Sequence, residues 1–346
     1  MSHKLNKLYL ESKINFNQSN EIMNKIKLSI LTSILIALSM NSYSDPKLYG
    51  KINIAADDQN GIHDYISNAS RLGVKGEIGL ENGLIGIYKI EYQIDPVDGY
   101  AQDEKRDSDG NITKSRMIAT KRNSLIGIKG NWGLVKIGFH DTYLKLSQDK
   151  VDLFNDLRGD MKNAFSGENR TSDFIGYESP VFGRGFQIKY NFSDGGSVDN
   201  GGIGNRDSNS YALSYKTEKF YASYASEDNS SKSSGEDHTR IVIQVPIGKF
   251  KIGLIDQESE LGSSKDDSTL ISISWKATDK FTAKFQTMDR KDENGIIQDD
   301  ITSLGLDYEL SNKLKLFFYS TEHEDGVITI LNQPEDYTGV GIEIKF

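Results

Sequence analysis

The chain ends on the stretch Tyr337-Thr338-Gly339-Val340-Gly341-Ile342-Glu343-Ile344-Lys345-Phe346. From Val340 onward, large apolar residues alternate strictly with Gly341, Glu343 and Lys345. This period of two predicts a β-strand with one face against an apolar medium and the other against water. Because terminal residues usually fray, a terminal strand that ends on an aromatic ring predicts that this end is paired and that closure of the fold depends on it.

The other end of the chain indicates which medium is involved. A short positive segment at residues 23–27 precedes an apolar run from Leu28 to Met40, and Ser42 and Ser44 supply small residues behind it. The pattern predicts a secretory signal peptide over residues 23–44, with cleavage before Asp45, since the run is too short to span a bilayer as a helix. Residues 1–22 are polar and aperiodic, and we interpret them as a dispensable leader or a start-site overextension.

The expected mature chain, residues 45–346, is acidic. Removing five Lys and two acids with residues 1–44 leaves 36 basic against 48 acidic residues, a net charge of −12, which disfavours nucleic acid as a partner. Cysteine is absent, and the mature chain has no run of about eighteen apolar residues that would predict a transmembrane helix. A closed barrel is then the one way for this chain to span a membrane, because every backbone polar group must be paired in lipid.

Two-faced strands of roughly ten residues recur along the chain, as transmembrane barrels require. Residues 71–80 alternate cleanly, and the Asn82-Gly83 pair predicts a hairpin turn into residues 84–95. We expect about sixteen strands, with short turns on one rim and eight longer loops on the other, in a single domain over residues 45–346. Aromatic residues near strand ends predict girdles at the membrane interfaces. These residues are Tyr49, Tyr92, Tyr143, Tyr177, Phe220, Tyr308 and Tyr337.

Four short segments and the last residue carry a family resemblance. The segments are Leu48–Lys51, Ser70–Glu77, Arg122–Gly130 and Asn169–Ser172, and Phe346 follows them in the same order and spacing. On these motifs the mature chain resembles the general trimeric porins of the Gram-negative outer membrane. The resemblance implies an all-β, 16-stranded antiparallel transmembrane barrel with long external loops, short periplasmic turns and a third loop folded into the lumen.

The resemblance also implies function and partners. It implies a homotrimer surrounded by outer-membrane lipid and lipopolysaccharide, which lets ions and small hydrophilic solutes diffuse passively and needs no cofactor or metal. Phe346 would then be the assembly signal that the outer-membrane assembly machinery reads.

Charged residues predict a constriction in the lumen. Lys51, Arg71 and Glu91 lie on the polar faces of their strands, and Arg122 and Arg170 match the basic wall positions of the family. Facing them we expect the third loop, roughly residues 144–168, which carries Asp152, Asp156 and Asp160 and is unusually apolar for an exposed loop. Opposed acidic and basic groups across a narrow neck set ion selectivity.

Three questions about the constriction stay open at this point. An Asp- and Lys-rich loop could be ordinary solvated surface, and the aspartate at the narrowest point is not identified. The stretch Leu125–Ile128 alternates poorly, so a β-bulge near Arg122 is one possibility. The acidic balance favours a mild preference for cations, which the basic wall opposes.

Two other classes of protein compete with a channel. An outer-membrane barrel with enzymatic activity would need a nucleophile and a histidine that meet at the rim. The mature histidines are His63, His140, His238 and His323, and His140-Asp141 is the pair at a strand end, where adjacent side chains point to opposite faces. We therefore expect no enzyme. A barrel with a surface adhesin role is the other form of this alternative. The second class is a soluble secreted β-sandwich with an adhesin-like role, which gives no reason for sixteen strands, for unequal loops or for Phe346.

Overall fold

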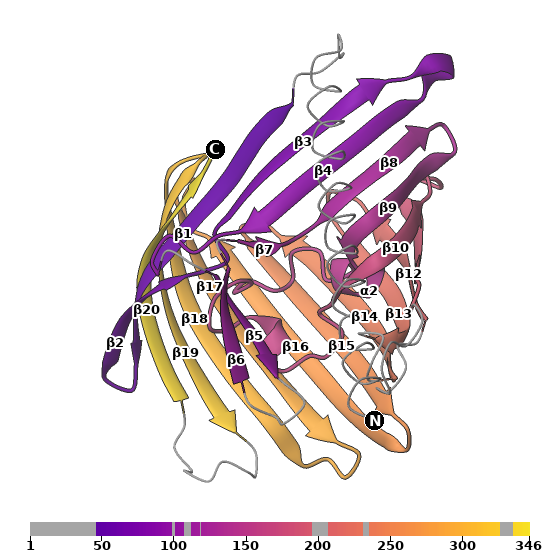
Figure 1. The fold of residues 1–346 in the computed structure, drawn as a ribbon. Coiled ribbons are helices and arrows are strands. Elements are labelled where there is room, and N and C mark those ends of the chain that lie inside the picture. Colours follow the sequence, from indigo (N-terminus) through magenta and orange to yellow (C-terminus); the bar gives the residue numbers. More distant parts are fainter. Residues whose placement is uncertain are drawn as a thin grey trace, which may run out of the picture.

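The computed structural model describes residues 46–98, 101–106, 112–117, 119–195, 207–230, 235–325 and 335–346. The chain forms a closed barrel of antiparallel strands (Figure 1). Its main sheet has 18 strands, of which β2 and β7 are short side pieces, so 16 strands form the wall. This confirms the predicted barrel. The predicted leader (1–22) and signal peptide (23–44) lie outside the described residues.

The strands follow the barrel in chain order. The wall consists of β1 (Lys47–Gln59), β3 (Arg71–Gly79), β4 (Ile85–Gln93), β8 (Ser124–Gly130), β9 (Gly133–Asp141), β10 (Arg170–Glu178), β11 (Phe186–Ser193), β12 (Ser208–Lys216), β13 (Tyr221–Ser230), β14 (Glu236–Ile247), β15 (Phe250–Leu261), β16 (Ser264–Lys276), β17 (Phe281–Asp292), β18 (Ile297–Ser311), β19 (Leu314–Asp325) and β20 (Glu335–Lys345). The side pieces are β2 (Ile62–Ser67), the hairpin of β5 (Ala101–Arg106) and β6 (Ile112–Met117), and β7 (Thr120–Lys121). No helix within the described ranges is long and apolar enough to cross a membrane.

The barrel closes where the last strand meets the first. β20 pairs with β1 from Lys51↔Lys345 to Gln59↔Tyr337, as the terminal alternation predicted. Beyond that register, Gly50 and Phe346 exchange two backbone hydrogen bonds of 3.1 and 3.2 Å. A Cβ on Gly50 would lie 2.5 Å from the Phe346 ring, so glycine leaves the space that the terminal ring fills. Phe346 is therefore held in the seam.

The alternation places apolar side chains outside and polar ones inside. On β20, Val340, Ile342 and Ile344 are exposed on the outer face, whereas Glu343 is buried on the inner face. Of the predicted girdle aromatics, four are exposed, namely Tyr92, Tyr177, Phe220 and Tyr308. The girdle prediction is wrong for Tyr49, Tyr143 and Tyr337. Tyr49 lies an even number of residues from Lys51 on β1 and so shares its inner face, and Tyr337 shares the inner face of β20 with Glu343 in the same way. Tyr143 opens the third loop.

Tight turns dominate one rim. The predicted Asn82-Gly83 turn is the 3-10 turn η1 (Glu81–Gly83), in which both residues have left-handed φ angles of 58° and 73°. On the opposite rim, the prediction of eight longer loops is wrong for two of them. β15 and β16 join through Gly262-Ser263, and β17 and β18 join through residues 293–296, because these four strands are 12 to 15 residues long and extend almost to their turns.

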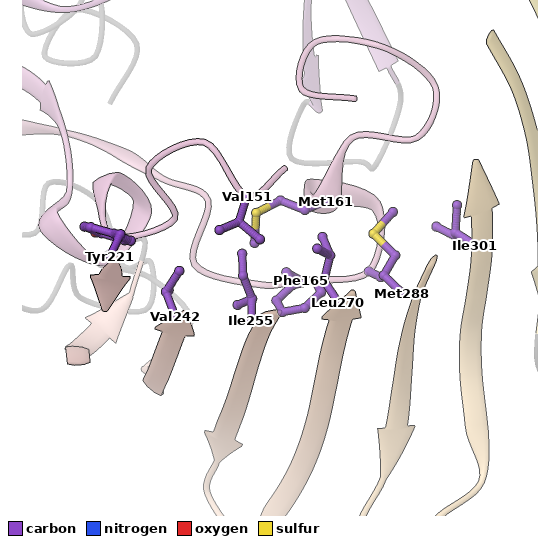
Figure 2. Packing of buried hydrophobic residues seen from close by; sticks show 10 residues of the cluster. Val151, Met161, Phe165, Tyr221, Val242, Ile255, Leu270, Met288 and Ile301 are labelled. Carbon is purple, nitrogen blue, oxygen red and sulfur yellow. The ribbon is translucent and has the colours of Figure 1, made fainter. Parts of the chain in front are cut away.

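The third loop, residues 142–169, folds into the barrel as predicted. It begins with the short helix α2 (Tyr143–Leu146), which Thr142 caps, and contains the 3-10 turn η2 (Met161–Asn163). Figure 2 shows its apolar residues, Val151, Met161 and Phe165, above the inner faces of successive strands. The wall side of this cluster supplies Val242, Ile255, Leu270, Met288 and Ile301, one each from β14 to β18. Apolar residues inside the barrel are thus covered by the loop.

Candidate pore constriction

A cavity of about 1110 Å³ lies between the third loop and the inner wall. Its wall side comes from β1, β3, β4, the segment before β8, and the facing ends of β9 and β10. All of the site residues predicted from the sequence line it, together with Phe346 at the seam. These site residues are Lys51, Arg71, Glu91, Arg122, Asp152, Asp156, Asp160 and Arg170. The fold therefore brings the predicted residues to one place.

Two of the three loop aspartates are used to build the loop itself. Asp152 accepts hydrogen bonds from the backbone N–H groups of Phe154 (3.0 Å) and Met161 (3.2 Å) and from the Gln286 amide (3.1 Å). Asp160 accepts from the backbone N–H groups of Asp156 (2.8 Å) and Lys162 (3.0 Å). Both carboxylates are buried. Burial, together with the neighbouring Asp160, raises the pKa of Asp152 to about 7.

Asp156 is the member of the trio that reaches across to the wall. Its Oδ2 lies 2.6 Å from Lys51 Nζ and 3.5 Å from Arg71 Nη1. Asp156 adopts a left-handed backbone conformation (φ 69°), and its N–H is fixed by Asp160. Burial by itself would raise the pKa of Asp156, but the charges of Lys51 and Arg71 outweigh burial and lower it. A permanent carboxylate thus stands against two cations.

Arg122 reaches the lumen through a β-bulge. β4 pairs Tyr92 with Lys121 but Lys89 with Leu125, so the segment 121–125 contains one residue more than the segment 89–92 that it faces. Arg122 lies in this bulge, as the poor alternation suggested. Its Nε donates to Glu91 Oε1 at 3.1 Å and its Nη1 donates to Gln93 at 2.9 Å.

Glu91 is the acidic centre of the basic wall. Besides Arg122, it accepts a hydrogen bond from Tyr49 Oη at 2.9 Å and lies 3.3 Å from Lys89 Nζ. Its negative charge is therefore shared among several donors, and it fixes the direction of Arg122 rather than standing free in the cavity.

Arg170 occupies the far end of the basic wall. Its Nε donates to Asn123 Oδ1 at 2.8 Å, and its Nη2 forms an ion pair with Asp141 Oδ1 at 2.8 Å. A second register shift between Thr171 and Phe174 follows it on β10. This shift explains how Phe174, fully buried against Tyr143 of the loop, comes to lie on the inner face.

Sequence reasoning missed four residues that complete the site. Asp141 and Asn123 orient Arg170, and Asn123 Nδ2 also donates to Asp141 at 2.6 Å. Arg158 of the loop binds Asp57 of β1. Asp57 could have been found, because it continues the inward parity of Lys51 and Asn53, whereas the orientation of Arg158 has no local signal. Within the ranges that the structure describes, no group of three His, Asp or Glu side chains could hold a metal ion.

Comparisons with known proteins agree with this architecture. The model of the family described as "Gram-negative porin" matches residues 30–325. The major outer membrane protein P.IB of Neisseria meningitidis serogroup B is 25% identical over 247 residues, which are 66% of this chain and 64% of that protein. The chain therefore matches slightly less than two thirds of that relative's length.

Solved structures share the fold at low identity. The anion-selective porin from Comamonas acidovorans superimposes with a TM-score of 0.67 at 18% identity, covering 87% of this chain and 99% of that one. The trimer form of OmpT from Vibrio cholerae gives a TM-score of 0.63 at 13% identity, with 87% and 99% coverage.

Proposed function

This chain belongs to the Gram-negative porin family, and from that premise we propose that it forms a water-filled channel in the outer membrane for passive diffusion of ions and small hydrophilic solutes. The observation that carries the proposal is the charged cavity between the inward third loop and the barrel wall. Family membership points to a channel rather than an enzyme.

We place the constriction beside the ion pairs of Asp156 with Lys51 and Arg71, with Glu91, Arg122 and Arg170 farther along the same wall. The short distances at this point support the assignment. Asp152 and Asp160 act there indirectly, because their hydrogen bonds shape the turn that presents Asp156.

The lining charges favour anions. Among the residues that the structure describes, ten basic side chains against seven acidic ones line the cavity. The basic set is Lys51, Arg71, Lys89, Arg122, Lys145, Lys150, Arg158, Lys162, Arg170 and Lys345, and the acidic set is Glu91, Asp141, Asp149, Asp152, Asp156, Asp160 and Glu168. Charges at the neck act within a few ångströms, whereas charges on external loops are screened beyond about 8 Å at physiological salt. We therefore favour a weak anion preference over the cation preference that the net charge of the chain suggests.

Three further assignments accompany the channel. A homotrimer is supported by the family resemblance and by the trimer form of one structural neighbour. Lipid and lipopolysaccharide would contact the apolar outer face, and Phe346 would be the residue that the assembly machinery recognises.

Recording from the purified protein in a planar lipid bilayer tests the proposal. We expect stepwise conductance in groups of three and a reversal potential, in a KCl gradient, on the anion side of zero. Protein that inserts, shows heat-modifiable migration on a gel and yet never conducts would overturn the channel, and single steps would overturn the trimer.

A further inference from the structure

A buried ion pair beside the barrel seam fastens the tip of the third loop to the wall. Arg158 donates from Nε and Nη2 to Asp57 Oδ2 on β1, at 2.9 and 2.5 Å. The Asp57 side chain is almost fully buried, so solvent screens this pair weakly. Bonds between a guanidinium and a carboxylate are among the strongest that side chains make.

The wall around Asp57 is shaped to receive this arginine. Tyr319 of β19 donates its hydroxyl to the second oxygen, Asp57 Oδ1, at 2.5 Å. The Arg158 guanidinium lies 4.5 Å from the ring centre of Tyr337 on β20, a cation–π contact. His323 Nε2 lies 3.1 Å from the Arg158 carbonyl oxygen. Three strands at the barrel seam therefore hold both the side chain and the backbone of one loop residue.

The ion pair stands next to the proposed neck. Arg158 follows Asp156 by two residues. Asp156 lies in a tight turn over residues 154–157, in which Leu157 N–H donates to Phe154 O at 2.8 Å. Arg158, Leu157 and Asp156 all line the cavity. Phe154 behind the turn is packed against the wall with Tyr319 and Phe317, so the cavity is the open side of this turn.

We propose that Arg158 and Asp57 form a positioning latch that holds the tip of the third loop against the inner wall of the barrel and thereby sets the width of the neck. The inference rests on the proposed channel function, and it concerns width rather than charge. If the latch is released, the tip can move into the cavity but not into the packed wall behind it. Arg158 is thus a positioning residue, and Asp156 is the group that meets the permeating ion.

Neutral solutes separate width from charge. We would compare uptake of a neutral monosaccharide and a neutral trisaccharide into liposomes carrying the wild type, R158Q, D57N or the double variant. For R158Q and D57N we expect the trisaccharide-to-monosaccharide rate ratio to fall about threefold, because passage depends steeply on pore diameter. Since both substitutions break the same contact, the double variant should show the same rate ratio as either single variant. R158K should restore part of the ratio.

K276Q is the control. Lys276 carries the same charge and forms an ion pair with Asp279 at 3.4 Å, but both residues are exposed and neither lines the cavity. K276Q should leave the ratio unchanged. Folding of each variant is checked by heat-modifiable migration. A folded R158Q or D57N with an unchanged or increased ratio, or a K276Q that lowers it equally, would overturn the latch.

A second measurement does not depend on transport. In D57N the backbone N–H groups of the loop tip, such as those of Leu157 and Asp160, should exchange with deuterated water faster in the folded barrel than in the wild type. Faster exchange in a D57N protein that never conducts would support the latch and reject the channel. Equal exchange rates in both proteins would reject the latch even if the wild type conducts.

Discussion

Asp156→Asn tests whether the carboxylate at the loop tip lies in the path of ions. The substitution keeps the size of the side chain but removes the negative charge that faces Lys51 Nζ at 2.6 Å and Arg71 Nη1 at 3.5 Å. Two cations would then face the neck with one compensating charge fewer. The pore should become more selective for anions.

The size of the shift follows from Coulomb's law. An uncompensated unit charge about 5 Å from a permeating ion is worth about 0.8 kcal/mol in water, which changes the local ion concentration about fourfold at about 1.4 kcal/mol per factor of ten. With a Debye length of about 8 Å at physiological salt, the change falls to about twofold. The local concentration of anions rises by the factor by which that of cations falls. The anion-to-cation permeability ratio should therefore rise about fourfold at physiological salt and by more at lower salt.

The reversal potential in a KCl gradient across a planar bilayer measures this ratio. Asp64→Asn is the control, because Asp64 is an exposed residue of β2 whose carboxylate accepts from Tyr65 N–H and does not line the cavity. It should behave like the wild type. A reversal potential for D156N equal to that of the wild type at both high and low salt would refute the placement of Asp156 in the conducting path.

Three further predictions concern the wall, the seam and the loop. Replacing Arg71 and Arg122 together with Gln should move the reversal potential towards cations, and no movement would remove them from the neck. Gly50→Ala should lower the unfolding free energy of the barrel in vesicles by about 1–3 kcal/mol, because the new Cβ would meet the Phe346 ring at 2.5 Å. The urea midpoint should fall accordingly, and an unchanged midpoint would contradict the packed seam. Since the folded-state pKa of Asp152 is raised to about 7, this carboxyl group binds more protons in the folded protein than in the unfolded chain, and its own contribution to stability should fall as pH rises from about 4 to 7. In urea titrations over this range, the unfolding free energy of the wild type should decrease relative to that of Asp152→Asn as pH rises, and an equal slope in both proteins would argue against it.

The sequence predicted the architecture well because strand alternation is a local property. Period-two patterns at residues 71–80 and 340–346 placed the apolar and polar faces correctly. The same alternation explains the two wrong girdle predictions for strand residues. Tyr49 and Tyr337 lie near strand ends, which is typical of girdle residues, but the alternation places both on the inner face. The two tight hairpins at Gly262 and residues 293–296 were mistaken for loops, because exposed strand ends carry the same polar residues as loops.

The sequence by itself determined the barrel and its closure through the terminal strand, because these follow from the spacing of apolar and polar residues along each strand. The same spacing placed Lys51, Arg71 and Glu91 on inward faces, whereas the assignment of Arg122 and Arg170 rested on the family resemblance. The tertiary structure decided what each charged residue does. Asp152, Asp156 and Asp160 look alike in the sequence, yet two bind the loop's own backbone and one faces Lys51. The reason is physical: a carboxylate takes its role from the donors around it, and the fold brings those donors to it from segments about a hundred residues away, as it brings Arg158 of the loop to Asp57 of β1.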